Sequence, residues 1–287
     1  MIVVGIDPAK PSGALVIGRS NLTTRIASSL VLAPLAIAAA YYGGVVFVVF
    51  WLIAAFCVLW EWDTLVCAHE KNQVLTVGLV AIAGTGLLLA LGRTTTAVAL
   101  IVLGALGAAT LASKAQRVWC VGGVLYAGAL LSAPILLRND AALGFAALVF
   151  LFTVVWLTDI VAFCCGHALG GPKLMPRVSP NKTWSGAIGG ALGGIIGGVV
   201  IASYAGIDNL VVVAILALLL SIASQAGDLL ESAIKRRFDA KDASGLIPGH
   251  GGVMDRVDGF LTAAVVAAAI GVSRGGLDAP AQGLLVW

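Results

Sequence analysis

The sequence has little charge. Asp, Glu, Lys and Arg together make up 11% of its 287 residues, whereas hydrophobic residues make up 60%. Soluble domains carry roughly 25% charged residues, so this composition excludes an ordinary soluble fold. The net charge of only +3 and the lack of a solvated basic domain also argue against a nucleic-acid partner.

Histidine and cysteine are equally scarce. The five cysteines include no CxxC pair of the kind that binds zinc. The three histidines are His69, His167 and His250, and so small a set does not favour hydrolysis by a Ser-His-Asp triad. Cysteine-bound zinc and triad chemistry are therefore not indicated.

Long apolar runs, in contrast, are abundant. A helix that spans a bilayer needs about 20 mainly apolar residues, and nine stretches approach that length. The sequence therefore predicts an all-α, polytopic integral membrane protein with about nine transmembrane helices. The predicted spans are 26–41, 44–60, 74–91, 95–112, 118–137, 142–163, 184–205, 209–227 and 259–273.

The basic residues predict how these spans are oriented. With a cytosolic N-terminus, only Arg93, Arg138 and Arg274 of the 17 Lys and Arg residues fall on the far side. Cytosolic loops carry an excess of Lys and Arg, so nine spans in this orientation satisfy the rule. Residues 1–25 lack the features of a secretory signal and are expected to form a cytosolic tail. We expect a multi-pass protein of the cell (inner) membrane with its site facing the cytosol.

Polar residues divide the rest of the chain. Residues 26–137 are expected to form N-terminal transmembrane helices, and 138–287 a catalytic transmembrane region with two cytosolic loops, 164–183 and 228–258. These loops contain most of the charge of the C-terminal half. Charge near a bilayer is costly, so function should be sought there. The glycines within 189–198 sit in an apolar span, where small residues favour close helix packing over phosphate binding.

The second loop contains two groups of polar side chains. If the eighth helix continues, one face of it carries acids, a hydroxyl and a base: Asp228, Glu231, Ser232 and Lys235. Asp255 and Asp258 are spaced i, i+3 and could share a divalent cation, because oxygen ligands favour Mg²⁺. The alternative is a pair of interfacial carboxylates balanced by Arg256.

Other polar residues have both a functional and a structural interpretation. Asp159, at the end of the sixth span, could line the same site or bond a neighbouring helix. The glycines around His250 let backbone N–H groups approach phosphate oxygens, but a turn that needs glycine explains them too. The first loop supplies cations and hydroxyls suited to a polyphosphate: Lys173, Arg177, Lys182, Ser179 and Thr183. Together these groups indicate a metal bridging an anionic polyphosphate, hence phosphoryl or nucleotidyl transfer.

The run from Ser232 to Asp258 contains S-x-x-K-R, K-D, P-x-H-G-G and D-R-x-D in that order. It resembles the signature of the phosphatidate cytidylyltransferases, the CDP-diacylglycerol synthases. The resemblance extends through GDLLES at 227–232 and VSPNKTW at 178–184. The multi-span layout covers nearly the whole chain, whereas the N-terminal third is similar only in hydropathy and in LTTRI at 22–26.

This resemblance implies transfer of cytidylate from CTP to phosphatidate, giving CDP-diacylglycerol and pyrophosphate. It implies that Mg²⁺ is required, with a second, monovalent cation left open, and that a homodimer forms. The implied catalytic residues are Asp228, Lys235, Asp255 and Asp258, of which Asp228 and Asp255 would bind metal. The implied substrate-binding residues are Lys173, Ser179, Lys182, Thr183, Ser232, Arg236, Lys241, His250, Gly251, Gly252 and Arg256.

The sequence departs from the family pattern at two positions. Ser185 stands where Glu is common, and Phe163 stands where Tyr is usual. Two other functions stay open: cytidylyl transfer to another lipid phosphate, and transport of phosphorylated solutes, which also uses basic loops and a buried Asp. A transporter predicts inverted repeats and charges at mid-membrane, and the sequence has neither.

Overall fold

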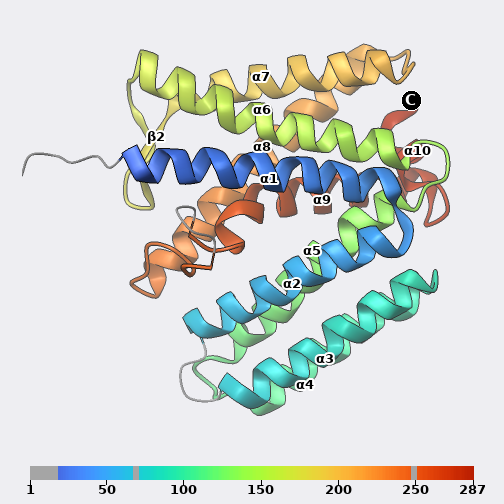
Figure 1. The fold of residues 1–287 in the computed structure, drawn as a ribbon, viewed down its shortest axis with the longest axis vertical. Helices are drawn as coiled ribbons and strands as arrows, with labels where there is room; N and C mark the ends of the chain where they lie inside the picture. The colour runs from blue at the N-terminus through green and yellow to red at the C-terminus, as the bar shows by residue number, and fades with distance from the viewer. Residues whose placement is uncertain (1–18, 67–70, 247–250) are drawn as a thin grey trace, which may run out of the picture.

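The computed structural model describes residues 19–66, 71–246 and 251–287. Ten helices and one hairpin make up this part of the chain (Figure 1). They are α1 (Arg19–Tyr42), α2 (Gly44–Val66), α3 (Lys71–Ala90), α4 (Thr94–Leu111), α5 (Arg117–Arg138), α6 (Gly144–Leu169), β1 (Lys173–Met175), β2 (Ser179–Thr183), α7 (Trp184–Tyr204), α8 (Leu210–Arg237), α9 (Met254–Gly275) and α10 (Pro280–Leu285).

The long apolar runs form helices as predicted. Within the described residues, eight helices, α2 to α9, are long and apolar enough to cross a membrane. The predicted all-α, polytopic fold is therefore confirmed. The first predicted span, 26–41, lies within α1, of which Val31–Tyr42 is an apolar helical stretch.

The polar segments differ from the predicted boundaries. Helix α6 continues to Leu169 and α8 to Arg237, so both predicted loops begin inside helices. The first loop then turns back as an antiparallel hairpin of β1 and β2. Helix α9 begins at Met254, five residues before the predicted span. Hydropathy located the apolar part of each helix, but the polar helix ends project beyond it.

Helices α6 and α7 form one edge of the bundle, and α3 and α4 form the opposite edge (Figure 1). Glycines explain how closely α7 approaches α6. A Cβ added to Gly190 would lie 2.7 Å from the carbonyl oxygen of Thr158, and one added to Gly186 would lie 2.8 Å from that of Ala162. The glycine-rich stretch is thus a helix-packing face, as predicted.

One hydrophobic core joins the N-terminal and C-terminal helices. At its centre Trp51 of α2 stacks on Phe260 of α9, with 4.8 Å between the ring centroids. Phe152 of α6 also stacks on Phe260, with 5.2 Å between the ring centroids. Such stacked aromatic pairs add about 0.5–1.5 kcal/mol each beyond their burial. Two residues that are distant in sequence, Trp51 and Phe152, therefore fix α9 in place.

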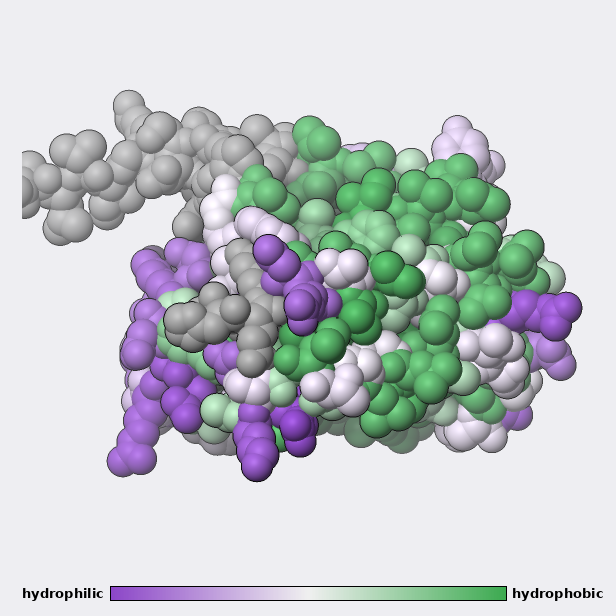
Figure 2. All heavy atoms as spheres, turned by 90° about the horizontal axis from the view of Figure 1, so that it is seen from below, coloured by the Kyte–Doolittle hydropathy of each residue, from purple (hydrophilic) through white to green (hydrophobic). Residues whose placement is uncertain are grey.

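The surface is divided along the helix axes. Hydrophobic side chains cover the middle of the molecule, and hydrophilic ones gather mainly at one end (Figure 2). Large apolar side chains are exposed on the outward faces of many helices, including Val80, Ile160 and Ile196. An exposed apolar band of this extent is what a polytopic membrane protein is expected to carry.

Candidate active site

A cavity of about 750 Å³ opens between α6, the β1–β2 hairpin, the start of α7, α8 and α9. Its lining is crowded with charge. The carboxylates are Asp159, Asp228, Glu231, Asp242, Asp255 and Asp258, and the cationic side chains are Lys173, Lys182, Lys235 and Arg256. This cavity is where the predicted polar groups converge.

Helix α6 presents one continuous face to the cavity. Its lining residues are spaced as one stripe of a helix, at i, i+3, i+4, i+7 and i+8: Asp159, Ala162, Phe163, Gly166 and His167. The Phe163 and His167 rings stack at 6.1 Å between centroids. Of the two interpretations of Asp159, the structure supports a place in the site.

Helix α8 continues through Asp228 to Arg237, which is the condition on which Asp228, Glu231 and Lys235 share one face. The Asp228 carboxylate lies 2.5 Å from the Lys182 ammonium of the hairpin and accepts a hydrogen bond from the Ser232 hydroxyl at 3.4 Å. One ion pair thus links the two predicted loops. Ser232 itself does not line the cavity.

Lys235 lies between two carboxylates. Its ammonium group is 2.5 Å from Glu231, one turn earlier on α8, and it donates a hydrogen bond to Asp255 of α9. Glu231 is only 1% exposed, and neither of its oxygens accepts a well-aligned hydrogen bond. The charge of Lys235 therefore stabilises two acids that would otherwise be buried side by side.

Asp255 is held from three directions. Besides Lys235, it accepts backbone N–H hydrogen bonds from Gly252 at 2.7 Å and Ala243 at 3.0 Å. Gly251 adopts a φ of +82°, and a Cβ there would lie 2.8 Å from an Asp255 oxygen. The glycine turn therefore folds tightly around Asp255, which is the conformational role that the sequence left open for it.

Two hydroxyl groups bond the end of the hairpin to the neighbouring helices. Thr183 caps α7 by accepting the N–H of Gly186 at 3.1 Å. Ser185 lies 3.0 Å from the Thr183 hydroxyl and donates to the carbonyl of Gly170. Ser185, one of the two predicted departures from the family pattern, thus ties the hairpin to the end of α6 and does not line the cavity. Lys173 and Lys182 reach the cavity from the same hairpin.

The structure places the predicted site residues in three groups. Eight line the cavity: Asp228, Lys235, Asp255, Asp258, Lys173, Lys182, Thr183 and Arg256. Gly251 and Gly252 adjoin Asp255, and four stand off the cavity: Ser179, Ser232, Arg236 and Lys241, of which Arg236 and Lys241 are exposed. His250 lies outside the described residues.

Several lining residues were not assigned from the sequence, among them His167, Asn181, Gln225 and Asp242. Two of them had a usable signal. Gln225 precedes Asp228 by three residues on one helix face, and His167 follows Asp159 by eight. Asn181 and Asp242 lie outside helices, where spacing does not indicate direction.

The lining is suited to a hard cation. Six carboxyl groups outnumber four cationic side chains in the lining, and oxygen ligands favour Mg²⁺. In the described part of the chain no three His, Cys, Asp or Glu side chains are already grouped around one metal position. Asp228 and Asp255 each contact a lysine instead.

Comparison with known proteins now adds to this geometry. A model of the family described as "Cytidylyltransferase family" matches residues 23–273. The chain belongs to this family.

Relatives within it carry a more specific name. The chain is 44% identical over 252 residues to the phosphatidate cytidylyltransferase of Brucella abortus biovar 1 (strain 9-941), covering 86% of this chain and 92% of that protein. It is 30% identical over 255 residues to the enzyme of the same name from Rickettsia bellii (strain RML369-C), covering 86% and 90%. The match to the Staphylococcus haemolyticus (strain JCSC1435) enzyme, 38% identical, covers 50% of this chain and 54% of that one. The predicted family is thus confirmed.

Proposed function

We propose that this protein is a phosphatidate cytidylyltransferase, which transfers cytidylate from CTP to phosphatidate and releases CDP-diacylglycerol and pyrophosphate. The observation that carries the proposal is the cavity in which the signature acids Asp228, Asp255 and Asp258 meet cations from a separate hairpin. Two relatives with this name, each matched over most of its length, support the choice of substrates. The polar end of an otherwise apolar bundle suits one water-soluble and one lipid substrate (Figure 2).

The reaction needs charge control more than a strong base. The phosphate of phosphatidate is already an anionic nucleophile, and two unit charges about 4 Å apart repel by about 4 kcal/mol at an effective dielectric of 20. Lys173, Lys182 and Arg256 line the cavity and can offset this repulsion. We propose that they bind the phosphates of CTP and the lipid, and that Lys235 stabilises charge developing on the departing pyrophosphate.

We further propose that Mg²⁺ is required. Asp228 and Asp255 would hold it, with support from Asp258, and the bound ion would neutralise charge on the polyphosphate. The carboxylate excess of the lining supports this assignment. The lysines that contact these two acids, Lys182 and Lys235, would then be released to the phosphates.

The cavity is proposed to face the cytosol of a cell (inner) membrane. Arg93, Arg138 and Arg274 lie at or beside the helix ends farthest from the cavity, and the other basic residues in the described part of the chain lie toward the cavity end, as expected for a cytosolic face. CTP would enter from water, and phosphatidate would keep its acyl chains in lipid. A homodimer remains a prediction.

The decisive assay is product formation by the purified protein in liposomes. With CTP, Mg²⁺ and phosphatidate together, we expect pyrophosphate release and CDP-diacylglycerol in equal amounts. Omission of any one of the three should stop both. Pyrophosphate release that does not depend on phosphatidate would contradict the proposal.

Another lipid phosphate is the second candidate acceptor. The residues assigned here contact phosphates and not acyl chains, so the same assay should compare phosphatidate with isoprenoid lipid phosphates. Transport of phosphorylated solutes is less well supported. The core beyond the cavity is filled by stacked aromatic rings and by the buried Thr158–Ser221 hydrogen bond at 2.8 Å.

A further inference from the structure

A buried glutamate from the N-terminal half of the chain contacts the signature loop directly. Glu61 of α2 is 0% exposed. Its carboxylate accepts the N–H of Val253 at 2.8 Å, the N–H of Met254 at 2.7 Å and the Ser244 hydroxyl at 2.6 Å. A carboxylate is rarely buried unless it is fully hydrogen-bonded, and here the donors come from residues more than 180 positions away.

These bonds fix the first turn of α9. The N-cap residue of α9, Val253, makes no side-chain capping bond of its own. Glu61 accepts N–H groups at this helix end, and a negative charge there is favoured by the helix dipole. A helix from another part of the chain therefore supplies the cap.

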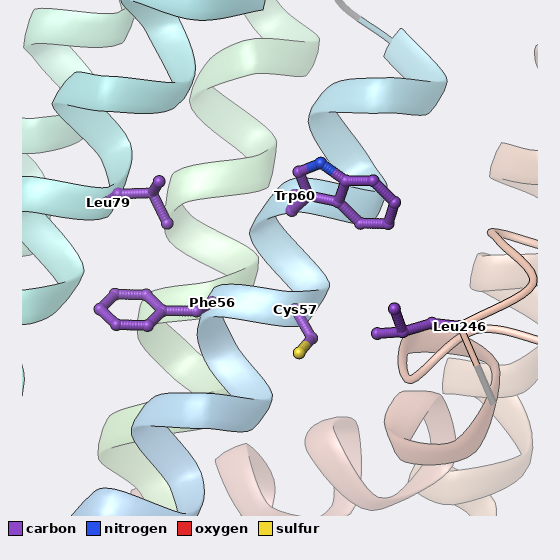
Figure 3. A pocket seen from close by; sticks show the side chains of 5 residues that line it. All are labelled: Phe56, Cys57, Trp60, Leu79 and Leu246. Atoms are coloured by element: carbon purple, nitrogen blue, oxygen red, sulfur yellow. The ribbon is translucent and has the colours of Figure 1, made fainter.

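The loop backbone sits directly on Glu61. A Cβ on Gly252 would lie 2.6 Å from the nearer Glu61 oxygen, so only glycine fits at this point. Leu246 of the same loop faces Cys57 and Trp60 of α2 across an apolar pocket of about 410 Å³ (Figure 3). The loop is thus placed against α2 by a polar contact at Glu61, with an apolar pocket beside it.

The contacts continue into the cavity. Gly252, which touches Glu61, donates its N–H to Asp255, and Asp255 accepts a hydrogen bond from Lys235. Glu61 itself does not line the cavity. A displacement of the loop would therefore move Asp255 and release Lys235.

We propose that Glu61 is a positioning residue of the active site, which sets the loop, Asp255 and, through it, Lys235. The predicted effect of Glu61 on turnover rests on the proposed function, whereas its predicted effect on the position of the loop does not. Glu61→Gln tests it, because an amide NH₂ would face one of the backbone N–H donors. Ser244→Ala removes one bond and leaves the carboxylate intact. Thr64→Ala is the matched control, since Thr64 is exposed and, among the described residues, donates to the Trp60 carbonyl within its own helix.

Two readouts are measured on the full-length protein in liposomes. In Glu61→Gln we expect kcat to fall roughly 100-fold, the cost of a misplacement near 1 Å. We expect the KM for CTP to stay within about threefold, because Lys173 and Lys182 belong to the hairpin. Hydrogen exchange of the peptide around 251–256 should be faster than in the wild type. Ser244→Ala should show the same pattern with a kcat loss below about tenfold, and Thr64→Ala should match the wild type.

The outcomes separate the two proposals. Unchanged exchange and unchanged kcat in both Glu61→Gln and Ser244→Ala would overturn the positioning role. If Glu61→Gln does not fold, Ser244→Ala decides alone: wild-type exchange and kcat there overturn the role. Wild-type protein that forms no CDP-diacylglycerol would refute the proposed function, while the exchange measurement would still report on the Glu61 contact.

Discussion

The two ends of the bundle use buried carboxylates in different ways. At the end away from the cavity, Asp140 is 1% exposed and accepts backbone N–H groups from Ala142, Leu143 and Gln282 at 2.8–3.0 Å. At the cavity end, Asp255 also accepts two backbone N–H groups, but it contacts Lys235 and faces the cavity. Asp140, which has only backbone partners among those named, is therefore interpreted as a structural acid. Asp255, which also contacts a cation and faces the cavity, is a candidate catalytic acid.

The strongest test of this contrast is Asp255→Asn. The change removes a negative charge that anchors Lys235 and is proposed to bind Mg²⁺, while the amide oxygen can still accept an N–H. We expect kcat to fall roughly 10³-fold, as when a key charge-stabilising group is lost, in protein that remains folded. CDP-diacylglycerol formation and thermal unfolding would be measured together.

Asp239→Asn is the control for that experiment. Asp239 is exposed, lies off the cavity and has a φ of 53°, a conformation that Asn adopts readily. It should retain wild-type activity. Near-normal turnover by Asp255→Asn would show that the metal assignment and the anchoring of Lys235 are both wrong.

A second test removes the cation instead of the acid. Lys235→Met leaves Glu231 and Asp255 close together without the charge between them, and unpairing a buried charge costs about 3–5 kcal/mol. We expect the free energy of unfolding to fall by about 3 kcal/mol and kcat to fall roughly 100-fold. Denaturant unfolding in micelles and the liposome assay measure the two effects. Arg237→Met, at an exposed position two residues on, should change neither; full stability of Lys235→Met would contradict the ion-pair interpretation.

Much of this architecture follows from the sequence. Apolar runs predicted the helices, and the spacing of Asp228, Glu231 and Lys235 showed which face they would share if α8 continued beyond 227, as it does. Glu61 could not be predicted in this way. The predicted span 44–60 ended just before it because a charged residue ends an apolar run, and its partners are distant in sequence. The cavity face of α6 was missed beyond residue 163 because 164–169 was assigned to the first cytosolic loop, whereas the helix continues to Leu169.

The spacing of the signature also has a second explanation in the structure. The glycines after His250 were predicted to bring N–H groups to phosphate. The Gly252 N–H donates to Asp255, and the Gly252 Cα sits against Glu61. Sequence motifs identify which residues act together, but they do not distinguish a residue that contacts substrate from one that shapes the loop around it.

The smallest effect on activity is expected at the opposite end, with Asp140→Asn. Burial by itself would raise the pKa of the Asp140 carboxyl, but the N–H groups of Gln282, Leu143 and Ala142 outweigh it and lower the pKa. An acid with a lowered folded-state pKa stabilises the fold above its unfolded value, about 3.9, and loses that contribution as the pH falls through the folded value.

The Asn variant should therefore be less stable at pH 7 by about 1–2 kcal/mol, because one former acceptor oxygen becomes an NH₂ group facing a backbone N–H. Its turnover at pH 7 should equal that of the wild type. Unfolding measured at pH 7 and below about pH 4 should show the difference between the two proteins shrinking in acid. A loss of turnover in stably folded Asp140→Asn would mean that the far end of the bundle takes part in the reaction, and the division of roles between the two ends would be wrong.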